Sequence, residues 1–213
     1  MAQNHFSAKP HITRAGTPFN DPLADVILRS CDSVDFHCHK LLLSMASAFF
    51  EGMFSLPQPH APGGDDAMGH GLQIIPMAES ASVLRTLLKL CHPSSLLNPP
   101  ILELEDVVDI FQTAQKYEME DMEKFIARNL VFPRFLDTEP ARVFDIACFL
   151  HLETEAKIAA AATLAFDIEE LHYSTALQLA YAEDHHCLID YHQQCGKAAR
   201  EIASDWKWLT TRN

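Results

Sequence analysis

Residues 34–54 constrain the fold of this 213-residue chain more than any other segment. The segment begins with alternating apolar and polar residues, the pattern of a half-buried strand. The alternating apolar residues are Val34, Phe36 and Cys38. After His39 the spacing changes to that of an amphipathic helix, with apolar positions at Leu42, Leu43, Ala46, Phe49, Phe50, Met53 and Phe54. The segment therefore predicts a strand that runs directly into a helix, which is broken near Ser47.

The flanking sequence extends this pattern into a mixed domain. Residues 24–29 predict a strand, and the polar residues 31–33 predict the turn of a hairpin. Residues 72–75 predict another short strand. Three helices are expected next, and their limits are set by the cap residue Ser80, by Pro99-Pro100, and by a start near Asp121 with a stop at Pro133. We expect an α/β domain of the α+β kind over 22–132, a small sheet flanked by about five helices.

Three further segments complete the expected organisation. Residues 1–21 have little apolar periodicity and predict a flexible N-terminal arm. Residues 57–71 are rich in glycine and proline and predict a mobile loop inside the domain. Residues 133–213 predict an all-α C-terminal extension, with helices starting near Pro140, Ala156, Ser174 and residue 183.

The charge of the chain excludes direct contact with nucleic acid. The net charge is −13, from 16 basic and 29 acidic residues, and repels a phosphate backbone. The sequence has neither a secretory signal nor a stretch long enough to span a bilayer, so no membrane partner is expected. Six cysteines without pairing rhythm predict reduced thiols in a cytoplasmic or nuclear protein.

The junction residues resemble the core signature of the BTB (POZ) domain. That family has approximately Phe-x-Ala-His-Lys, a leucine three residues later, and Ser-x-x-Phe-x-x-Met-Phe. This chain matches with Phe36, His39, Lys40, Leu43, Ser47, Phe50, Met53 and Phe54, and Cys38 replaces the small alanine. The similarity covers about 22–132, and a looser one extends to fungal BTB families with a helical C-terminal extension. From its place at the junction, we expect His39 to cap the helix or lie in the core.

The resemblance implies a protein–protein interaction module that forms a homodimer and serves as an adaptor or scaffold. In the family, an aspartate on the first strand approaches the basic residue after the signature histidine, near the base of the dimer. The matching dimer-interface candidates are Asp25, Lys40, Leu41, Leu42 and Met45. The alternative is that Asp25 and Lys40 form an ordinary surface ion pair worth at most about 1 kcal/mol.

The resemblance also suggests a substrate adaptor of a cullin-based ubiquitin ligase. Such adaptors often carry an apolar-x-Glu motif soon after the Met-Phe pair. Here the candidate cullin contacts are Phe54, Leu56 and Gln58, and glutamine stands in place of the glutamate. This departure weakens the cullin hypothesis and leaves it as an alternative.

Two other classes of function have weaker support in the sequence. A zinc-stabilised helical region would use His185, His186, His192 and Cys195, but the paired cysteine motifs of structural zinc sites are missing. The known catalytic and phosphate-binding motifs are also missing, so the sequence predicts neither an enzyme nor a cofactor.

Overall fold

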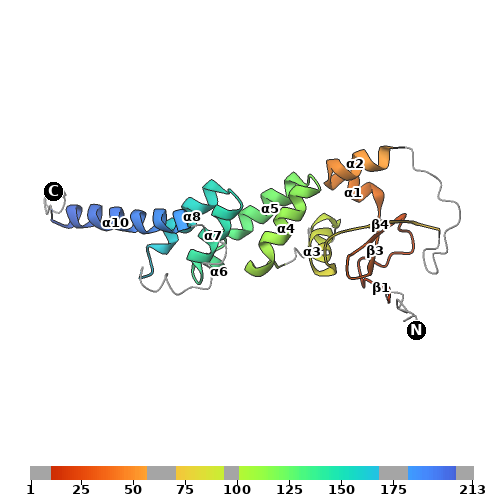
Figure 1. Ribbon diagram of the computed structural model, residues 1–213, viewed down its shortest axis with the longest axis horizontal. Coiled ribbons are helices and arrows are strands. Elements are labelled where there is room, and N and C mark those ends of the chain that lie inside the picture. The colour runs from red at the N-terminus through yellow and green to blue at the C-terminus, as the bar shows by residue number, and fades with distance from the viewer. Residues whose placement is uncertain (1–10, 57–70, 94–100, 168–181, 205–213) are drawn as a thin grey trace, which may run out of the picture. The chain divides into compact units, whose positions relative to one another are not determined.

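The computed structural model describes residues 11–56, 71–93, 101–167 and 182–204, with side chains in the last range from 186 onward. The chain divides into two compact units between Lys124 and Phe125. Figure 1 shows strands and helices in the first unit, whereas the described elements of the second unit are helices. This combination confirms the expected α+β fold class.

A four-stranded mixed sheet forms the centre of the first unit. Its strands are β1 (Thr13–Arg14), β2 (Val26–Arg29), β3 (Val34–Cys38) and β4 (Gln73–Pro76), in the order β1-β3-β2-β4. β2 and β3 form the predicted antiparallel hairpin, in which Leu28 lies opposite Phe36. β1 adds to β3 and β4 adds to β2, both in parallel. The inner strand β2 is therefore buried on both faces.

Residues 11–21, which the sequence predicts as part of a flexible arm, instead pair with the sheet and pack on it. The backbone N–H of Ala15 donates to the carbonyl of Asp35, which extends the β1–β3 pairing. The Phe19 side chain is 3% exposed, and its ring meets the Phe36 ring edge-on at 5.4 Å. The strand is only two residues long, too short for a periodic signal, and for this reason the sequence does not reveal it.

The strand–helix junction has the form that the sequence predicts. α1 (Lys40–Ala46) begins directly after β3, and α2 (Ala48–Ser55) follows it with a break at Ser47. The Ser47 hydroxyl accepts a hydrogen bond from the N–H of Phe50 at 3.1 Å, as a cap residue does. Ser47 also donates to the carbonyl of Tyr117 at 2.5 Å, which ties the break to a distant part of the unit.

Helices α3 (Ala81–Cys91) and α4 (Leu104–Lys116) pack against each other in the first unit. Ser80 caps α3 through the N–H of Val83, as predicted. α5 (Glu120–Leu130) contains the boundary between the two units, whereas the sequence places the end of the domain at 132. The shared core consists largely of leucine, isoleucine and phenylalanine side chains from β2, β3, α3 and α4.

The second unit contains α6 (Pro133–Leu136), α7 (Pro140–Phe149), α8 (Glu153–Thr163) and α10 (Ala182–Ser204). α5 ends at Leu130, before Pro133, as predicted, and Pro133 then begins α6, because the first helical turn needs no N–H from that residue. α7 packs against α8 and also contacts α10. The helix expected near Ser174 lies outside the described residues. Among the described helices, none has the length and apolar character needed to cross a membrane.

Candidate interaction surface

The signature residues of the junction divide into a buried and a partly exposed group. Phe36, Leu43 and Phe50 are at most 2% exposed and belong to the core. Met53 and Phe54 are half-buried on α2. Phe54 therefore lies at the edge of the core, where its ring stacks with that of Phe50 at 5.9 Å.

His39 holds the N-cap position of α1, but its side chain neither caps the helix nor lies in the core, so that expectation was wrong. No hydrogen bond joins its side chain to the first turn of the helix. The ring is about one-third exposed, and its Nε2 lies 3.1 Å from Oδ2 of Asp21. The histidine thus connects the β3–α1 junction to the segment that leads from β1 to β2.

Asp25 provides the cap that His39 does not. Oδ1 of Asp25 accepts a hydrogen bond from the backbone N–H of Lys40, the first residue of α1, at 2.7 Å. The Lys40 ammonium lies elsewhere, 5.3 Å from the centre of the Phe54 ring. The two residues are therefore neighbours, but they meet through the Lys40 backbone and form no ion pair within the described chain.

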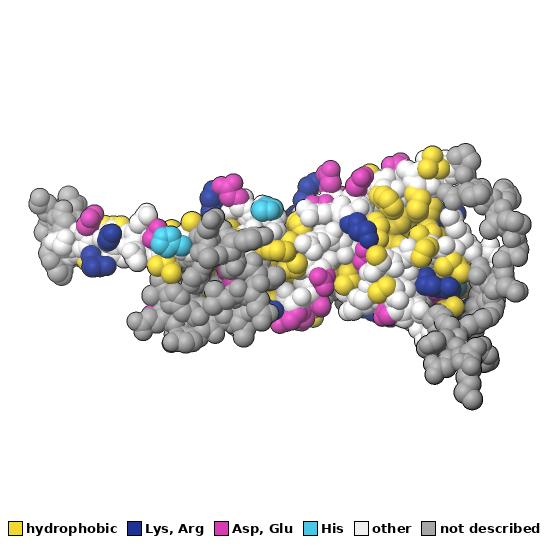
Figure 2. Space-filling model, viewed as in Figure 1, with side chains coloured by type: hydrophobic (Ala, Val, Ile, Leu, Met, Phe, Trp, Pro, Cys, Tyr) yellow, Lys and Arg dark blue, Asp and Glu magenta, His cyan; other side chains and the backbone are white. Residues whose placement is uncertain are grey.

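The remaining dimer-interface candidates lie on different faces of α1. Leu41 is 70% exposed and Met45 is 77% exposed, and their spacing of four residues places them one above the other on the helix surface. Leu42 is half-buried and lines a pocket on the other side of α1. Figure 2 shows hydrophobic side chains gathered on the visible face of the first unit, where Figure 1 places α1, α2 and β4.

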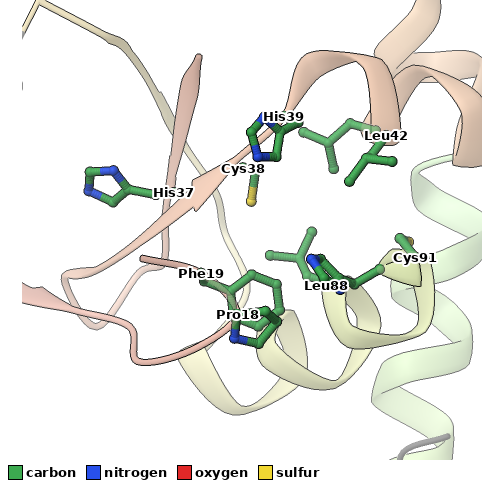
Figure 3. Close-up of a pocket in the computed structure, with 10 residues that line it drawn as sticks. Pro18, Phe19, His37, Cys38, His39, Leu42, Leu88 and Cys91 are labelled. Carbon is green, nitrogen blue, oxygen red and sulfur yellow. The ribbon is translucent and has the colours of Figure 1, made fainter. Parts of the chain in front are cut away.

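The pocket beneath α1 lies between β3, the end of α3 and the segment before β2 (Figure 3). His37 and Cys38 lie on opposite sides of β3, as the strand alternation predicts. Burial raises the pKa of both the Cys38 and the Cys91 thiols to about 12. Both thiols stay protonated at neutral pH, so neither has the thiolate character of a nucleophile or a metal ligand.

The structure describes two of the three candidate cullin contacts. Leu56 follows α2 and is 63% exposed, whereas Phe54 is half-buried. Gln58 lies outside the described residues. The cullin hypothesis therefore stays a prediction.

Three of the four candidate zinc ligands have described side chains, and these three have other partners. Nε2 of His192 lies 2.8 Å from the hydroxyl of Thr163, which joins α10 to α8. The exposed His186 lies 3.6 Å from the Asp190 carboxylate. Cys195 is half-buried and hydrogen-bonds Tyr191, whereas the side chain of His185 lies outside the described residues. Among described residues, no three side chains of histidine, cysteine, aspartate or glutamate come together as a metal site would need.

One polar cluster, which is centred on Glu79, is not identified from the sequence. The Glu79 carboxylate accepts hydrogen bonds from Lys116 Nζ at 2.5 Å and from the Tyr117 hydroxyl at 2.7 Å. Burial alone would raise the pKa of Glu79, but these two hydrogen bonds outweigh it and hold the pKa below its usual value. The cluster ties the start of α3 to the end of α4.

Glu79→Gln is expected to lower the melting temperature at neutral pH, with a loss of about 1 kcal/mol in unfolding free energy. The folded-state pKa of Glu79 lies below its unfolded value of 4.5. Its contribution is therefore complete above that value and is lost as the pH falls through the folded-state pKa. Thermal melts between about pH 7 and pH 3 should show that the difference in melting temperature from the wild type disappears in acid.

The matched control is Glu153→Gln, which breaks an exposed pair with Lys157 and should have a much smaller effect. A difference that persists unchanged in acid would contradict this role of Glu79.

The first part of the chain is similar to a known protein family. The family model of the BTB/POZ domain matches residues 18–132, which is more than half of the chain. Among solved structures, the chain is similar to the BTB domain of zebrafish PATZ1, with 23% identity and a TM-score of 0.36. That alignment covers 48% of this chain and 71% of the other. A comparison with curated proteins gives no match. BTB/POZ domains are protein–protein interaction modules, and this chain belongs to the BTB/POZ domain family.

Proposed function

We propose that this protein forms a homodimer through the exposed face of α1 and acts as a non-enzymatic adaptor or scaffold. The observation that carries the proposal is the pair Leu41 and Met45, two large apolar side chains that are 70% and 77% exposed one helical turn apart. Apolar side chains that cluster on a surface beyond the needs of the core mark interaction sites. A rigid two-turn helix also presents them at little entropic cost.

The structure around α1 supports a preformed surface. Leu43, on the inner side of the helix, is 2% exposed and anchors α1 in the core. Asp25 caps the first turn of α1, and Ser47 caps α2 directly after the last residue of α1. The outer face is therefore held in place before any partner binds, which favours association of the chain as it stands.

Sedimentation velocity of the full chain over a range of concentrations tests the proposal. We expect the wild type to be a dimer at tens of micromolar, an affinity in the ordinary range of such interfaces. Met45→Asp should raise the dissociation constant about 100-fold, because it would bury a carboxylate without a partner. Ile101→Asp is the matched control, since Ile101 is 73% exposed in the same unit and outside α1.

Two results would contradict the proposal. One is a folded wild type that stays monomeric at these concentrations. The other is a dimer that Met45→Asp and Ile101→Asp affect equally, because the interface would then lie away from the outer face of α1. Far-ultraviolet circular dichroism of each variant establishes that it is folded.

A further inference from the structure

The apolar stripe of α10 continues past the part of the helix that packs on its own unit. Leu188 is 3% exposed, and Nε2 of His192 lies 2.8 Å from the hydroxyl of Thr163, so this part of α10 is anchored to its neighbours. Cys195, one turn later, is half-buried, whereas Ile202 is 64% exposed. In Figure 1 the far end of α10 extends beyond α7 and α8 within the second unit. The stripe is therefore exposed to solvent over about its last two turns.

The residues of this stripe share one property, which is that none of them is lysine, arginine, aspartate or glutamate. A rotation of about 100° per residue places the following positions on one side of α10: Leu188, Tyr191, His192, Cys195, Ala198, Ala199, Ile202 and Ala203. The acidic Asp190 and Glu201 and the basic Lys197 and Arg200 lie on the other side. These four charges balance, so the stretch 188–204 is neutral in a chain of net charge −13.

The exposed part of the stripe is too small to hold a separate protein by itself. Specific complexes bury about 800 Å² on each partner, contributed by some 20–30 residues. The exposed part consists of Ile202 and the three alanines at 198, 199 and 203. A partner is therefore expected to bind here only if another contact already holds it close.

We propose that the exposed end of α10 packs against α10 of a second copy of this chain. The inference rests on the proposed homodimer, because association through α1 confines two α10 helices to one particle, at an effective concentration on the order of millimolar. Such a concentration allows a small contact to form that would not hold two free chains together. α10 lies outside residues 18–132, which the BTB/POZ family model matches, so the contact would be a property of the C-terminal region.

The charge of the stretch 188–204 also favours a second copy of α10 as the partner. Each chain carries a net charge of −13, so two chains repel each other over most of their surface. The stripe itself brings no like charges together when two copies face each other, and its apolar side chains leave water on contact.

Sedimentation equilibrium of the full chain tests the inference with Ile202→Lys, Gln193→Lys and Met45→Asp. Lysine suits the last turn of a helix, so Ile202→Lys removes the apolar contact without weakening the end of α10. We expect this variant to raise the dissociation constant of the dimer about tenfold. Gln193 is exposed and lies on the opposite side of α10 from Ile202, so Gln193→Lys adds the same charge and should leave the constant unchanged.

The failure of the α10 contact is distinguishable from the failure of the homodimer. If Ile202→Lys matches Gln193→Lys while Met45→Asp weakens the dimer, the α10 contact is wrong and the homodimer stands. A wild type that stays monomeric would overturn the homodimer and this inference with it. Circular dichroism verifies that each variant keeps the helix content of the wild type.

Hydrogen exchange of the amides in residues 196–204 gives a second test. Pairing of the helices should slow exchange there at concentrations that favour the dimer, and dilution below the dissociation constant should restore fast exchange. Ile202→Lys should exchange fast at both concentrations, whereas Gln193→Lys should follow the wild type. If exchange in the wild type does not depend on concentration although the dimer forms, the inference is overturned.

Discussion

Phe50→Ala is expected to lower the free energy of unfolding by about 3–5 kcal/mol, the cost of removing a fully buried phenylalanine. The Phe50 side chain is 1% exposed and lies at the centre of an aromatic cluster. Its ring stacks with Tyr117 at 5.4 Å and with Phe54 at 5.9 Å. Alanine would leave a cavity and also remove these ring contacts, which contribute beyond simple burial.

Phe49→Ala provides the matched control, because Phe49 precedes Phe50 in α2 but is 41% exposed. We expect a loss of roughly 1 kcal/mol for this variant, since its ring already faces solvent on one side. Urea denaturation, monitored through the hydrogen exchange of the β3 amides, measures the stability of the first unit. Equal losses for the two variants would show that Phe50 is not the centre of the core.

The sequence predicts well those elements that depend on a pattern of adjacent residues, such as a helix cap or a change of hydrophobic period. Ser47 and Ser80 cap helices that begin at the next residue, and each accepts a hydrogen bond from the N–H three positions later. A cap depends on a few adjacent residues, so its pattern is visible in the sequence. The strand–helix junction is predicted for the same reason, because its two periods meet at His39.

The contacts that the sequence does not predict join distant segments. His39 meets Asp21 across 18 residues, and Glu79 meets Lys116 across 37. The sequence spacing of these residues does not identify their partners, so His39 is mistaken for a cap and the contacts of Glu79 are not predicted.

The pair Arg29 and Asp35 is an intermediate case. The two residues lie opposite each other in the antiparallel register of β2 and β3. The predicted hairpin turn at 31–33 is enough to propose the pair, because the turn sets the register and the register determines which residues are cross-strand neighbours. Its strength, however, depends on the burial of Asp35, which results from the addition of β1 to the other edge of β3.

Arg29→Met is expected to lower the free energy of unfolding by about 3 kcal/mol, the lower end of the range for a broken buried ion pair. Nε of Arg29 lies 2.6 Å from Oδ1 of Asp35, and Nη2 lies 2.9 Å from Oδ2. The Asp35 side chain is 5% exposed, so its carboxylate would stay buried without its main counter-charge. The lower value applies because the Arg29 side chain is 25% exposed and partly screened by water.

The double variant Arg29→Met, Asp35→Leu separates the charge effect from the loss of packing. Replacing both partners removes the buried carboxylate as well as the guanidinium, and such replacements are often close to neutral. We therefore expect the double variant to be more stable than Arg29→Met alone, by at least about 1 kcal/mol in the same hydrogen-exchange measurement on β3. A double variant that is less stable than the single one would contradict this account. Because both variants carry methionine at position 29, that result would mean that Asp35 stabilises the hairpin through contacts other than its ion pair with Arg29.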